Sequence, residues 1–114
     1  MYMQGLGLRR IAEFKDHNGF DGVMLERPGF GFHFEFTHCR HSPVSPAPTA
    51  EDLIVFYVPS AEHWMTRCEA MLDAGFLEVD SYNPYWSQRG RTFQDPDGYR
   101  IVIEHASWRG EGEA

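Results

Sequence analysis

Phenylalanine occupies every second position in residues 31–37, and polar side chains fill the positions between. A hydrophobic period of two is typical of a β-strand whose two faces meet different surroundings. We therefore predict a strand over this segment and place Phe32, Phe34 and Phe36 in the core. The polar residues of the strand then share the opposite face of the sheet.

An apolar strand followed by an amphipathic helix is predicted in the second half of the chain. Residues 53–58 form an uninterrupted apolar run with branched and aromatic side chains, which indicates a strand. Beyond Ser60, Trp64, Cys68 and Met71 recur near the 3.6-residue period of a helix. Serine is a favourable residue for the N-terminal cap of such a helix.

Turn signals divide the rest of the chain into short strands. Asn18-Gly19 is a strong signal for a β-hairpin, and the sequence Asp-Pro-Asp-Gly at residues 95–98 predicts a second tight turn. Glycines at positions 5 and 7 predict the end of a helix in the first residues. Further strands are predicted over residues 8–14, 20–25, 76–79, 91–94 and 99–104.

The order of these elements nearly repeats along the chain. Residues 1–40 contain a helix end and three strands, and residues 52–106 contain a strand, a helix and three strands. Residues 41–51 hold three prolines and indicate an exposed linker, and residues 107–114 a flexible tail. We predict that all 114 residues form one domain of the α+β class.

Charge and cysteine content exclude several classes of partner. The formal charge is −7, from 17 acidic and 10 basic residues, and no basic cluster is present that would neutralise nucleic-acid phosphates. No apolar run approaches the ~20 residues that cross a bilayer, and no secretory signal pattern is present. Cys39 and Cys68 are therefore expected to be free thiols in a cytoplasmic protein, with a disulfide between them as the alternative.

Three local motifs, in this element order, resemble the vicinal-oxygen-chelate superfamily of glyoxalases, bleomycin-resistance proteins and extradiol dioxygenases. Residues 92–101, Thr-Phe-Gln-Asp-Pro-Asp-Gly-Tyr-Arg-Ile, look like the final hairpin of that superfamily. Tyr2 with residues 5–8, and residues 33–36, support the match, which covers about the whole chain. The resemblance implies paired βαβββ modules that form an open, cup-shaped mixed sheet.

By this resemblance the first module is truncated, because no strand precedes the helix that ends near Gly7. An unpaired sheet edge exposes backbone groups that proteins usually pair or cover. We expect a partner chain or an exchanged segment to fill the gap, as in a homodimer. The alternatives are that the edge is tolerated or that sequence before it is missing.

Metal-dependent members of the superfamily bind a divalent ion at four positions, on the first and last strands of each module. In this chain the first position has no strand and the second falls on Glu35. The third falls on Leu53, or on Asp52 if the register shifts by one, and the fourth falls on Val102. One clear carboxylate in four positions does not hold a divalent metal tightly, so we predict no metal cofactor.

Two weaker metal hypotheses stay open. His33, Glu35 and Glu104 share the inward-facing parity and would meet at a displaced metal site. A zinc site within residues 38–41 would need a second pair of ligands, which the sequence does not offer. Without a metal, we expect Glu35 to bond to an inward-facing donor such as Arg100 and His33 to line a pocket wall.

The predicted function is a metal-free small-molecule-binding protein of the glyoxalase and bleomycin-resistance type. The alternative is a metal-dependent lyase, isomerase or dioxygenase in which Glu35 is the catalytic base, because desolvation raises the proton affinity of a carboxylate. A module without any ligand is a third possibility. Phe30 is expected at the rim of the site, and Tyr57, Tyr82, Tyr85 and Trp86 are expected to line it, with ordinary packing as the alternative for the loop 82–86. The predicted ligand-binding residues are His33, Glu35, Thr37, Leu53, Val55, Tyr57, Tyr85, Trp86, Arg100, Val102 and Glu104.

Overall fold

The structure is a computed structural model that describes residues 1–29 and 31–107. The predicted rim position of Phe30 and the tail from residue 108 onward lie outside the described residues. The elements, in chain order, are α1 (Tyr2–Leu6), β1 (Arg9–His17), β2 (Phe20–Glu26), β3 (Phe34–Cys39), β4 (Leu53–Tyr57), α2 (Ala61–Asp73), β5 (Leu77–Val79), η1 (Pro84–Ser87), β6 (Gly90–Gln94) and β7 (Arg100–Glu104).

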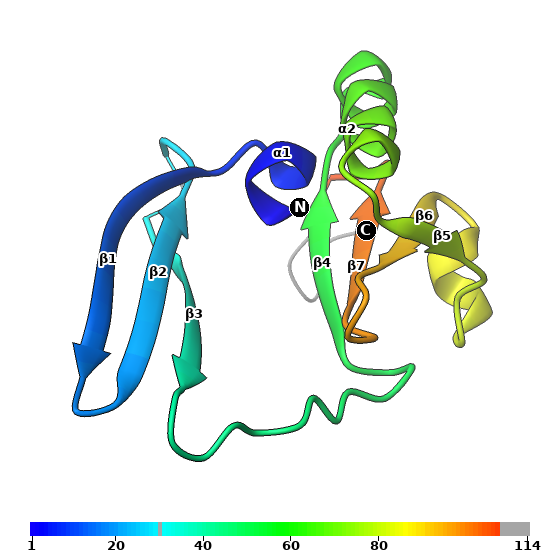
Figure 1. Ribbon diagram of the computed structural model, residues 1–114. Helices are drawn as coiled ribbons and strands as arrows, with labels where there is room; N and C mark the ends of the chain where they lie inside the picture. The colour runs from blue at the N-terminus through cyan, green and yellow to red at the C-terminus, as the bar shows by residue number, and fades with distance from the viewer. Residues whose placement is uncertain (30, 108–114) are drawn as a thin grey trace.

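The described strands form two sheets that lie side by side (Figure 1). The first sheet has the order β1-β2-β3 and is antiparallel throughout. The second has the order β4-β7-β6-β5, in which β4 pairs with β7 in parallel and the other pairs are antiparallel. The predicted α+β architecture is confirmed.

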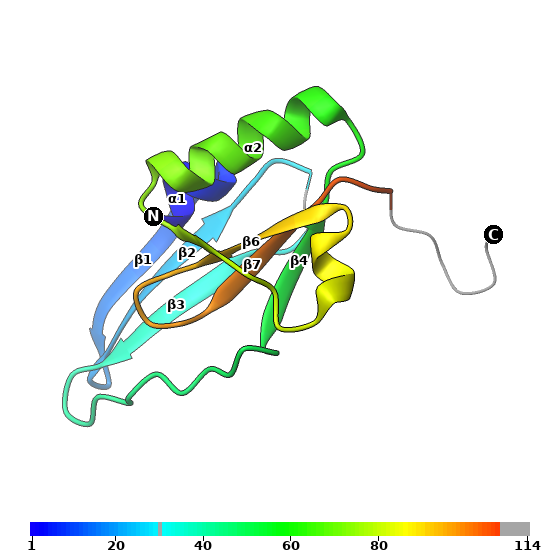
Figure 2. The ribbon, with the colours of Figure 1, turned by 90° about the vertical axis from the view of Figure 1, so that its right-hand side faces the viewer.

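Helix α2 covers one face of the second sheet (Figure 2). It begins at the predicted cap, where the Ser60 hydroxyl accepts a hydrogen bond of 3.3 Å from the backbone N–H of His63. Cys68 and Met71 point from the helix into the core and are fully buried. Within the described parts of the chain, no helix is long and apolar enough to cross a membrane. The sheet residues beneath α2 in this core include Phe93, Ile101 and Ile103.

The first sheet is less covered than the second, because α1 has five residues and α2 has thirteen. Phe34 is half-buried and packs against the core, but Phe32 is 55% exposed and Phe36 is 37% exposed. The prediction that all three phenylalanines lie in the core is therefore wrong. The strand begins at Phe34 and not at residue 31, and no long helix covers this sheet.

The two modules are joined near α1. The Tyr2 hydroxyl donates a hydrogen bond of 2.6 Å to the Asp95 carboxylate, and its ring lies 5.0 Å from the ring of Phe36. From α2, the Arg67 guanidinium donates a hydrogen bond of 2.9 Å to the carbonyl of Gly5 in α1. Tyr2 therefore links the first sheet to the turn between β6 and β7.

Both predicted turns are present in the structure. Asn18 and Gly19 adopt positive φ values of 52° and 85° between β1 and β2. In the second turn, one Asp95 carboxylate oxygen accepts hydrogen bonds from the backbone N–H groups of Asp97 and Tyr99. This turn sets the pairing of β6 with β7 and so positions the candidate site described below.

Candidate functional site

The second sheet has one face toward α2 and one face away from it. Ile101 and Ile103 belong to the core beneath α2, and the Trp64 indole donates a hydrogen bond of 2.9 Å to the carbonyl of Ile103. Because side chains alternate along a strand, the other residues of β7 and their partners on β4 point to the opposite face. We call this the inner face. It carries Leu53, Val55, Tyr57, Arg100, Val102 and Glu104, all of which were predicted to face inward together.

The short helix η1 lies over part of the inner face. The Asn83 side chain accepts a hydrogen bond of 3.0 Å from the backbone of Tyr85, and Pro84 occupies the first turn, so the loop begins as a capped 3-10 turn. The rings of Tyr85 and Trp86 meet edge to face at 4.9 Å. Figure 2 shows η1 on the side of the sheet opposite α2. The predicted aromatic loop is therefore positioned above the inner face.

A cavity of about 360 Å³ opens between η1 and the ends of β4 and β7. Tyr57 and Tyr85 supply aromatic walls, and Glu104 supplies a carboxyl group. The structure thus brings three of the predicted ligand-binding residues to one place. We call it the Glu104 cavity, and it is lined by Tyr57, Tyr85, Gln88, Arg89, Glu104, Ala106 and Ser107.

Glu104 is the buried acidic group of this cavity, with a relative exposure of 4%. Its Oε1 atom has no hydrogen-bond partner among the described residues. The carboxyl packs against Gly90, where any side chain would collide with it. Burial raises the pKa of Glu104, and the positive charge of Arg89 opposes this shift only in part. The carboxyl therefore keeps its proton to a higher pH than an exposed glutamate.

Two hydroxyl groups share the inner face with Glu104. Thr92 pairs with Val102 across the β6–β7 ladder, is buried, and its hydroxyl has no partner among the described residues. The pKa of Tyr57 is raised by burial and, to a lesser extent, by the charges of Tyr85 and Glu104. The Tyr57 hydroxyl therefore keeps its proton to a higher pH than an exposed tyrosine.

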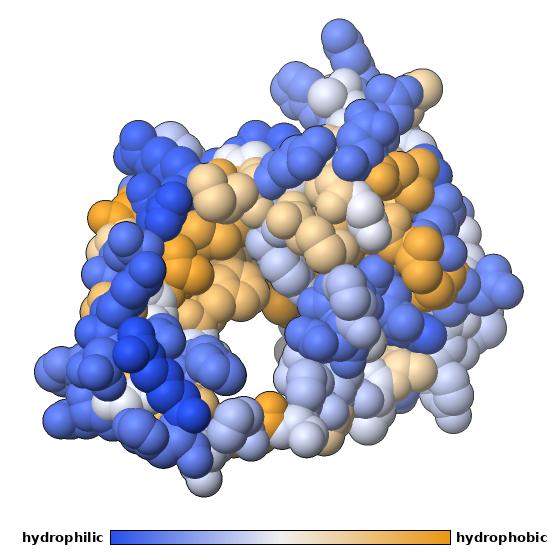
Figure 3. Space-filling view, in the orientation of Figure 1, coloured by the Kyte–Doolittle hydropathy of each residue, from blue (hydrophilic) through white to orange (hydrophobic). Residues whose placement is uncertain are grey.

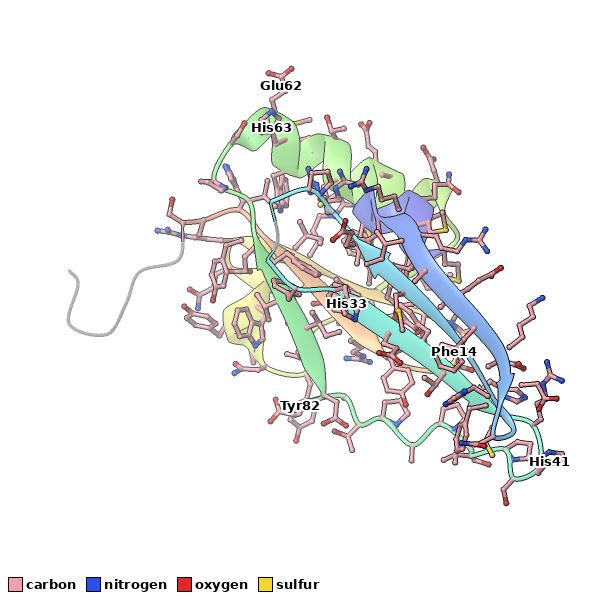
Figure 4. All side chains as sticks on the ribbon, turned by 90° about the vertical axis from the view of Figure 1, so that its left-hand side faces the viewer. Phe14, His33, His41, Glu62, His63 and Tyr82 are labelled. Atoms are coloured by element: carbon pink, nitrogen blue, oxygen red, sulfur yellow. The ribbon has the colours of Figure 1, made fainter. Side chains whose placement is uncertain are left out.

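The predicted residues of the first module lie elsewhere. Figure 4 shows His33 at the start of β3, and its Nε2 atom is 3.9 Å from the Glu35 carboxylate. Both side chains are about half exposed to solvent. Glu35 and Thr37 line a second cavity, of about 570 Å³, between the two sheets, and Ile54 lines it from the other side. Glu104 is not part of this inter-sheet cavity.

Two expected contacts of Glu35 are not formed. His33, Glu35 and Glu104 do not come together, because the first two lie on a separate sheet from the third. Arg100 does not bond to Glu35. Its guanidinium instead donates to the Gln94 side chain at 3.0 Å and to a backbone carbonyl of the β5–η1 loop at 3.3 Å, since β6 is its neighbour in the sheet.

The donor set does not fit a resident divalent metal. Leu53 and Val102 place apolar side chains on the inner face at two of the superfamily's ligand positions. Asp52, the alternative third ligand, accepts a hydrogen bond of 2.7 Å from the backbone of Thr49 within a turn. Across residues 1–29 and 31–107, no group of three or more His, Cys, Asp or Glu side chains is arranged to hold a metal ion.

The two cysteines are free thiols that lie far apart in the fold, so the disulfide alternative is wrong. Cys39 is half-buried at the end of β3, where the neighbouring Arg40 is held by the Asp21 carboxylate at 2.9 Å and 3.0 Å. Cys68 is fully buried in the core, and burial raises the pKa of its thiol to about 11. Cys68 therefore supplies no second ligand for a zinc site near Cys39.

Gln88, Arg89 and Thr92 were not predicted as site residues, although one signal in the sequence pointed to them. Once the turn at residues 95–98 fixes the hairpin, the register places Gly90 directly opposite Glu104. A glycine opposite an inward-facing glutamate indicates that the carboxyl occupies the space of the missing side chain. The strand register alone would therefore have indicated that the residues next to Gly90 belong to the site.

Residues 1–37 match the YycE-like N-terminal domain, and residues 51–105 match the YycE-like C-terminal domain. YycE of Bacillus subtilis strain 168, named as an uncharacterised protein, is 46% identical over 102 residues, which are 90% of this chain and 73% of YycE. The chain belongs to the YycE-like family. The name of the Bacillus subtilis relative states no function.

Solved structures place the YycE-like fold within a wider group. One match is a crystal structure of YycE from Bacillus subtilis, which is described as a protein of unknown function and a candidate glyoxalase/fosfomycin resistance protein. Its TM-score is 0.86 and its sequence identity is 44%, over 98% of this chain and 81% of that chain. Trypanothione-dependent glyoxalase I of Leishmania major matches in fold, with a TM-score of 0.64 and 18% identity over 92% and 73% of the two chains.

A glyoxalase/bleomycin resistance protein/dioxygenase superfamily member from Sphaerobacter thermophilus also shares the fold. Its TM-score is 0.51 and its identity 16%, over 90% of this chain and 81% of that one. The predicted resemblance to this superfamily is confirmed.

Proposed function

We propose that this YycE-like chain binds a small organic molecule in the Glu104 cavity without a resident metal. The observation that carries the proposal is the buried Glu104 carboxyl, which lines a cavity and has no partner for Oε1 among the described residues. Leaving a buried polar group unpaired costs about 1–3 kcal/mol. Packing alone gives no reason for a carboxyl at this position, whereas a ligand that contacts the same wall does.

The chemistry of the cavity favours a ligand rich in hydrogen-bond acceptors. The Arg89 guanidinium offers hydrogen-bond donors to this space, and burial raises the pKa of the Glu104 carboxyl beside it. The Tyr85 ring supplies an apolar wall beside them. The volume of about 360 Å³ lies near the lower end of typical ligand pockets. We therefore expect a small carboxylate, phosphonate or related oxyanion with a compact apolar part.

The description of one relative suggests the first compound to test. The Bacillus subtilis YycE structure carries the description of a glyoxalase/fosfomycin resistance protein. Fosfomycin is a small phosphonate, and a guanidinium group binds the oxygens of such an anion well. It therefore fits the acceptor-rich class of ligand that Arg89 favours.

The proposal is tested by thermal unfolding of chelated protein with fosfomycin and a panel of small carboxylates and phosphonates. A ligand at about 100 times its Kd stabilises the native state by about 2.7 kcal/mol and raises Tm accordingly. We expect Arg89→Gln and Tyr85→Ala to abolish the rise. Arg10→Gln, which changes an exposed arginine on β1, is the matched control and should leave it unchanged. A rise that survives both cavity variants but disappears in Glu35→Ala would place the site in the first module and sink the proposal.

The metal-dependent alternative has its own measurement. Mn²⁺, Fe²⁺, Ni²⁺, Co²⁺ or Zn²⁺ added to chelated protein should leave Tm unchanged if the site is metal-free. A reproducible rise that Glu35→Ala removes would favour a lyase, isomerase or dioxygenase instead. The homodimer and the cytoplasmic location stay predictions, and sedimentation velocity tests the first of them.

A further inference from the structure

A further pocket lies on the face of the second sheet that α2 covers. Phe56 of β4 and Ile103 of β7, which are partners in the ladder, both line it. Its volume is about 130 Å³, well below the ~300–1,000 Å³ of pockets that enclose a whole organic ligand. Tyr57 lines both this pocket and the Glu104 cavity. We call it the Arg67 pocket, and its other lining residues are Leu6, Arg27, Val58 and Arg67.

The backbone at the end of α1 holds the Arg67 guanidinium in place. Its Nη1 atom donates a hydrogen bond of 2.9 Å to the carbonyl of Gly5. Gly7 has a positive φ of 67°, and a Cβ added there would lie 3.0 Å from Nη2 and 3.2 Å from Nη1 of Arg67. The guanidinium therefore packs directly against this backbone. Its remaining N–H groups have no hydrogen-bond partner among the described residues.

Arg27 brings a second positive charge to the same pocket. It directly follows β2, at the end of the first sheet nearest to α1 (Figure 1). Figure 3 shows hydrophilic side chains along this border, above the hydrophobic surface of the first sheet. Burial lowers the pKa of Arg67, and the charge of Arg27 lowers it further. The two guanidinium groups are therefore close enough to repel each other.

This pair of charges has no counter-charge within the described parts of the chain. Neither Arg27 nor Arg67 forms an ion pair with a described carboxyl group. An arginine that bonds to a carbonyl at the end of a helix stabilises that end, which accounts for Arg67 alone. The bond to α1 gives no reason for a second guanidinium beside it. An anion in the pocket does.

The size and chemistry of the pocket indicate which anion fits. The planar fork of a guanidinium matches two oxygens of a phosphate group, and two such groups balance a dianion. Leu6, Phe56 and Val58 add apolar surface beside the charges, and a charge interaction is stronger beside apolar surface than in water. A volume of about 130 Å³ suits the anionic group itself and not the rest of an organic molecule.

We propose that Arg27 and Arg67 together bind a phosphate group in the Arg67 pocket. Each guanidinium donates hydrogen bonds to the phosphate oxygens, and the bound anion offsets the repulsion between the two arginines. The site takes one side chain from each module, since Arg27 follows β2 and Arg67 belongs to α2. It lies on the opposite face of the second sheet from the Glu104 cavity and does not rest on the function proposed for that cavity.

The test is a titration of the full chain with inorganic phosphate at about pH 8, where phosphate is mainly a dianion. Sodium chloride keeps the ionic strength constant, because screening alone changes the stability of a chain with a net charge of −7. We expect phosphate to raise Tm. In amide NMR spectra it should shift Gly7, Arg27 and Arg67 and leave Gly90 unchanged.

Phenyl phosphate distinguishes the two sources of such a group. Binding at least about tenfold tighter than that of inorganic phosphate would assign the site to a phosphate monoester, whose organic part adds to the affinity. Equal affinity would assign it to free phosphate.

The variants separate a binding role from a structural one. Arg27→Gln should weaken phosphate binding at least about tenfold, the loss expected for bonds to a charged group. Without phosphate its Tm should equal or exceed that of the parent chain, because the repulsion of Arg67 is gone. Arg67→Gln should weaken binding as well, but it also loses the bond to α1 and should lower Tm. Arg10→Gln, on β1, is the matched control and should bind phosphate like the parent chain.

Two results would overturn the proposal. One is the absence of any Tm rise or amide shift with phosphate in the millimolar range. The other is phosphate binding that survives Arg27→Gln and Arg67→Gln but is lost in Arg89→Gln, because the anion would then lie in the Glu104 cavity. Phosphate binding that persists in Arg89→Gln while the organic ligand is lost would show that the two sites are separate, so each proposal can fail without the other.

Discussion

The second module buries its sheet under a thirteen-residue helix, whereas the helix of the first module has five residues and packs against α2. The largest fully buried side chains all belong to the second module: Phe93, Met71, Ile101, Ile103, Val102 and Cys68. In the first sheet, Ile11, Phe20 and Phe36 stay exposed. Fold stability and the candidate ligand site thus reside in the same half, and the other half keeps more of its large apolar side chains exposed.

The largest expected effect comes from truncating one apolar side chain in each module. Phe93→Ala should lower the free energy of unfolding by about 3–5 kcal/mol, because it leaves a cavity in a fully packed core. Ile11→Ala should lower it by less than about 1 kcal/mol, because Ile11 is exposed on β1. Urea unfolding measures both. Similar losses for the two variants would show that the first sheet is packed as tightly as the second.

A smaller effect is expected where the two modules are joined. Tyr2→Phe removes the hydrogen bond to the Asp95 carboxylate and should lower the free energy of unfolding by about 1.5–3 kcal/mol, the range for bonds to charged groups. Amide exchange should accelerate mainly in the first sheet. Tyr99→Phe, at an exposed tyrosine, is the matched control. Uniform acceleration across both sheets would contradict a separate first module.

The smallest effect concerns the pH dependence that Glu104 gives to the second module. Its pKa is raised in the folded chain, so its contribution to stability is fully present below the unfolded value of about 4.3 and is lost as pH rises through the folded pKa. Glu104→Gln should lack this loss and become more stable than the parent chain as pH increases. Urea unfolding between pH 4 and pH 9 tests the trend, with Glu35→Gln as an exposed control. A difference between Glu104→Gln and the parent chain that does not grow with pH would contradict a buried, proton-retaining carboxyl.

Much of the second module was predictable because its signals are local. The turn at residues 95–98 and the two-residue period of β7 are sufficient to place Val102 and Glu104 on one face and Ile101 and Ile103 on the other. The parity of β4, by contrast, was assigned from the resemblance, with a shift by one residue to Asp52 left open. These predictions succeed because a strand paired on both sides and covered by a helix leaves one register that buries its apolar side chains.

The first sheet was harder to predict, because burial depends on the layer that covers a strand. Phe32 and Phe36 follow the correct period, but no long helix covers them, and the period begins at Phe32, before the strand itself. Arg89 was missed for a related reason. Its place beside Gly90 follows from the β6–β7 register, but the fold of the η1 connection that precedes it depends on tertiary packing over the inner face and not on a repeating pattern.

The central claim is that the ligand site lies in the Glu104 cavity of the second module and not on β3. The most direct measurement is an amide NMR titration of chelated, nitrogen-15-labelled protein with the compound that raises Tm most. The account predicts the largest shift changes at Tyr85, Arg89, Gly90 and Glu104, with Glu35 and Thr37 unaffected. Shift changes centred on Glu35 and Thr37, with none around Glu104, would contradict it.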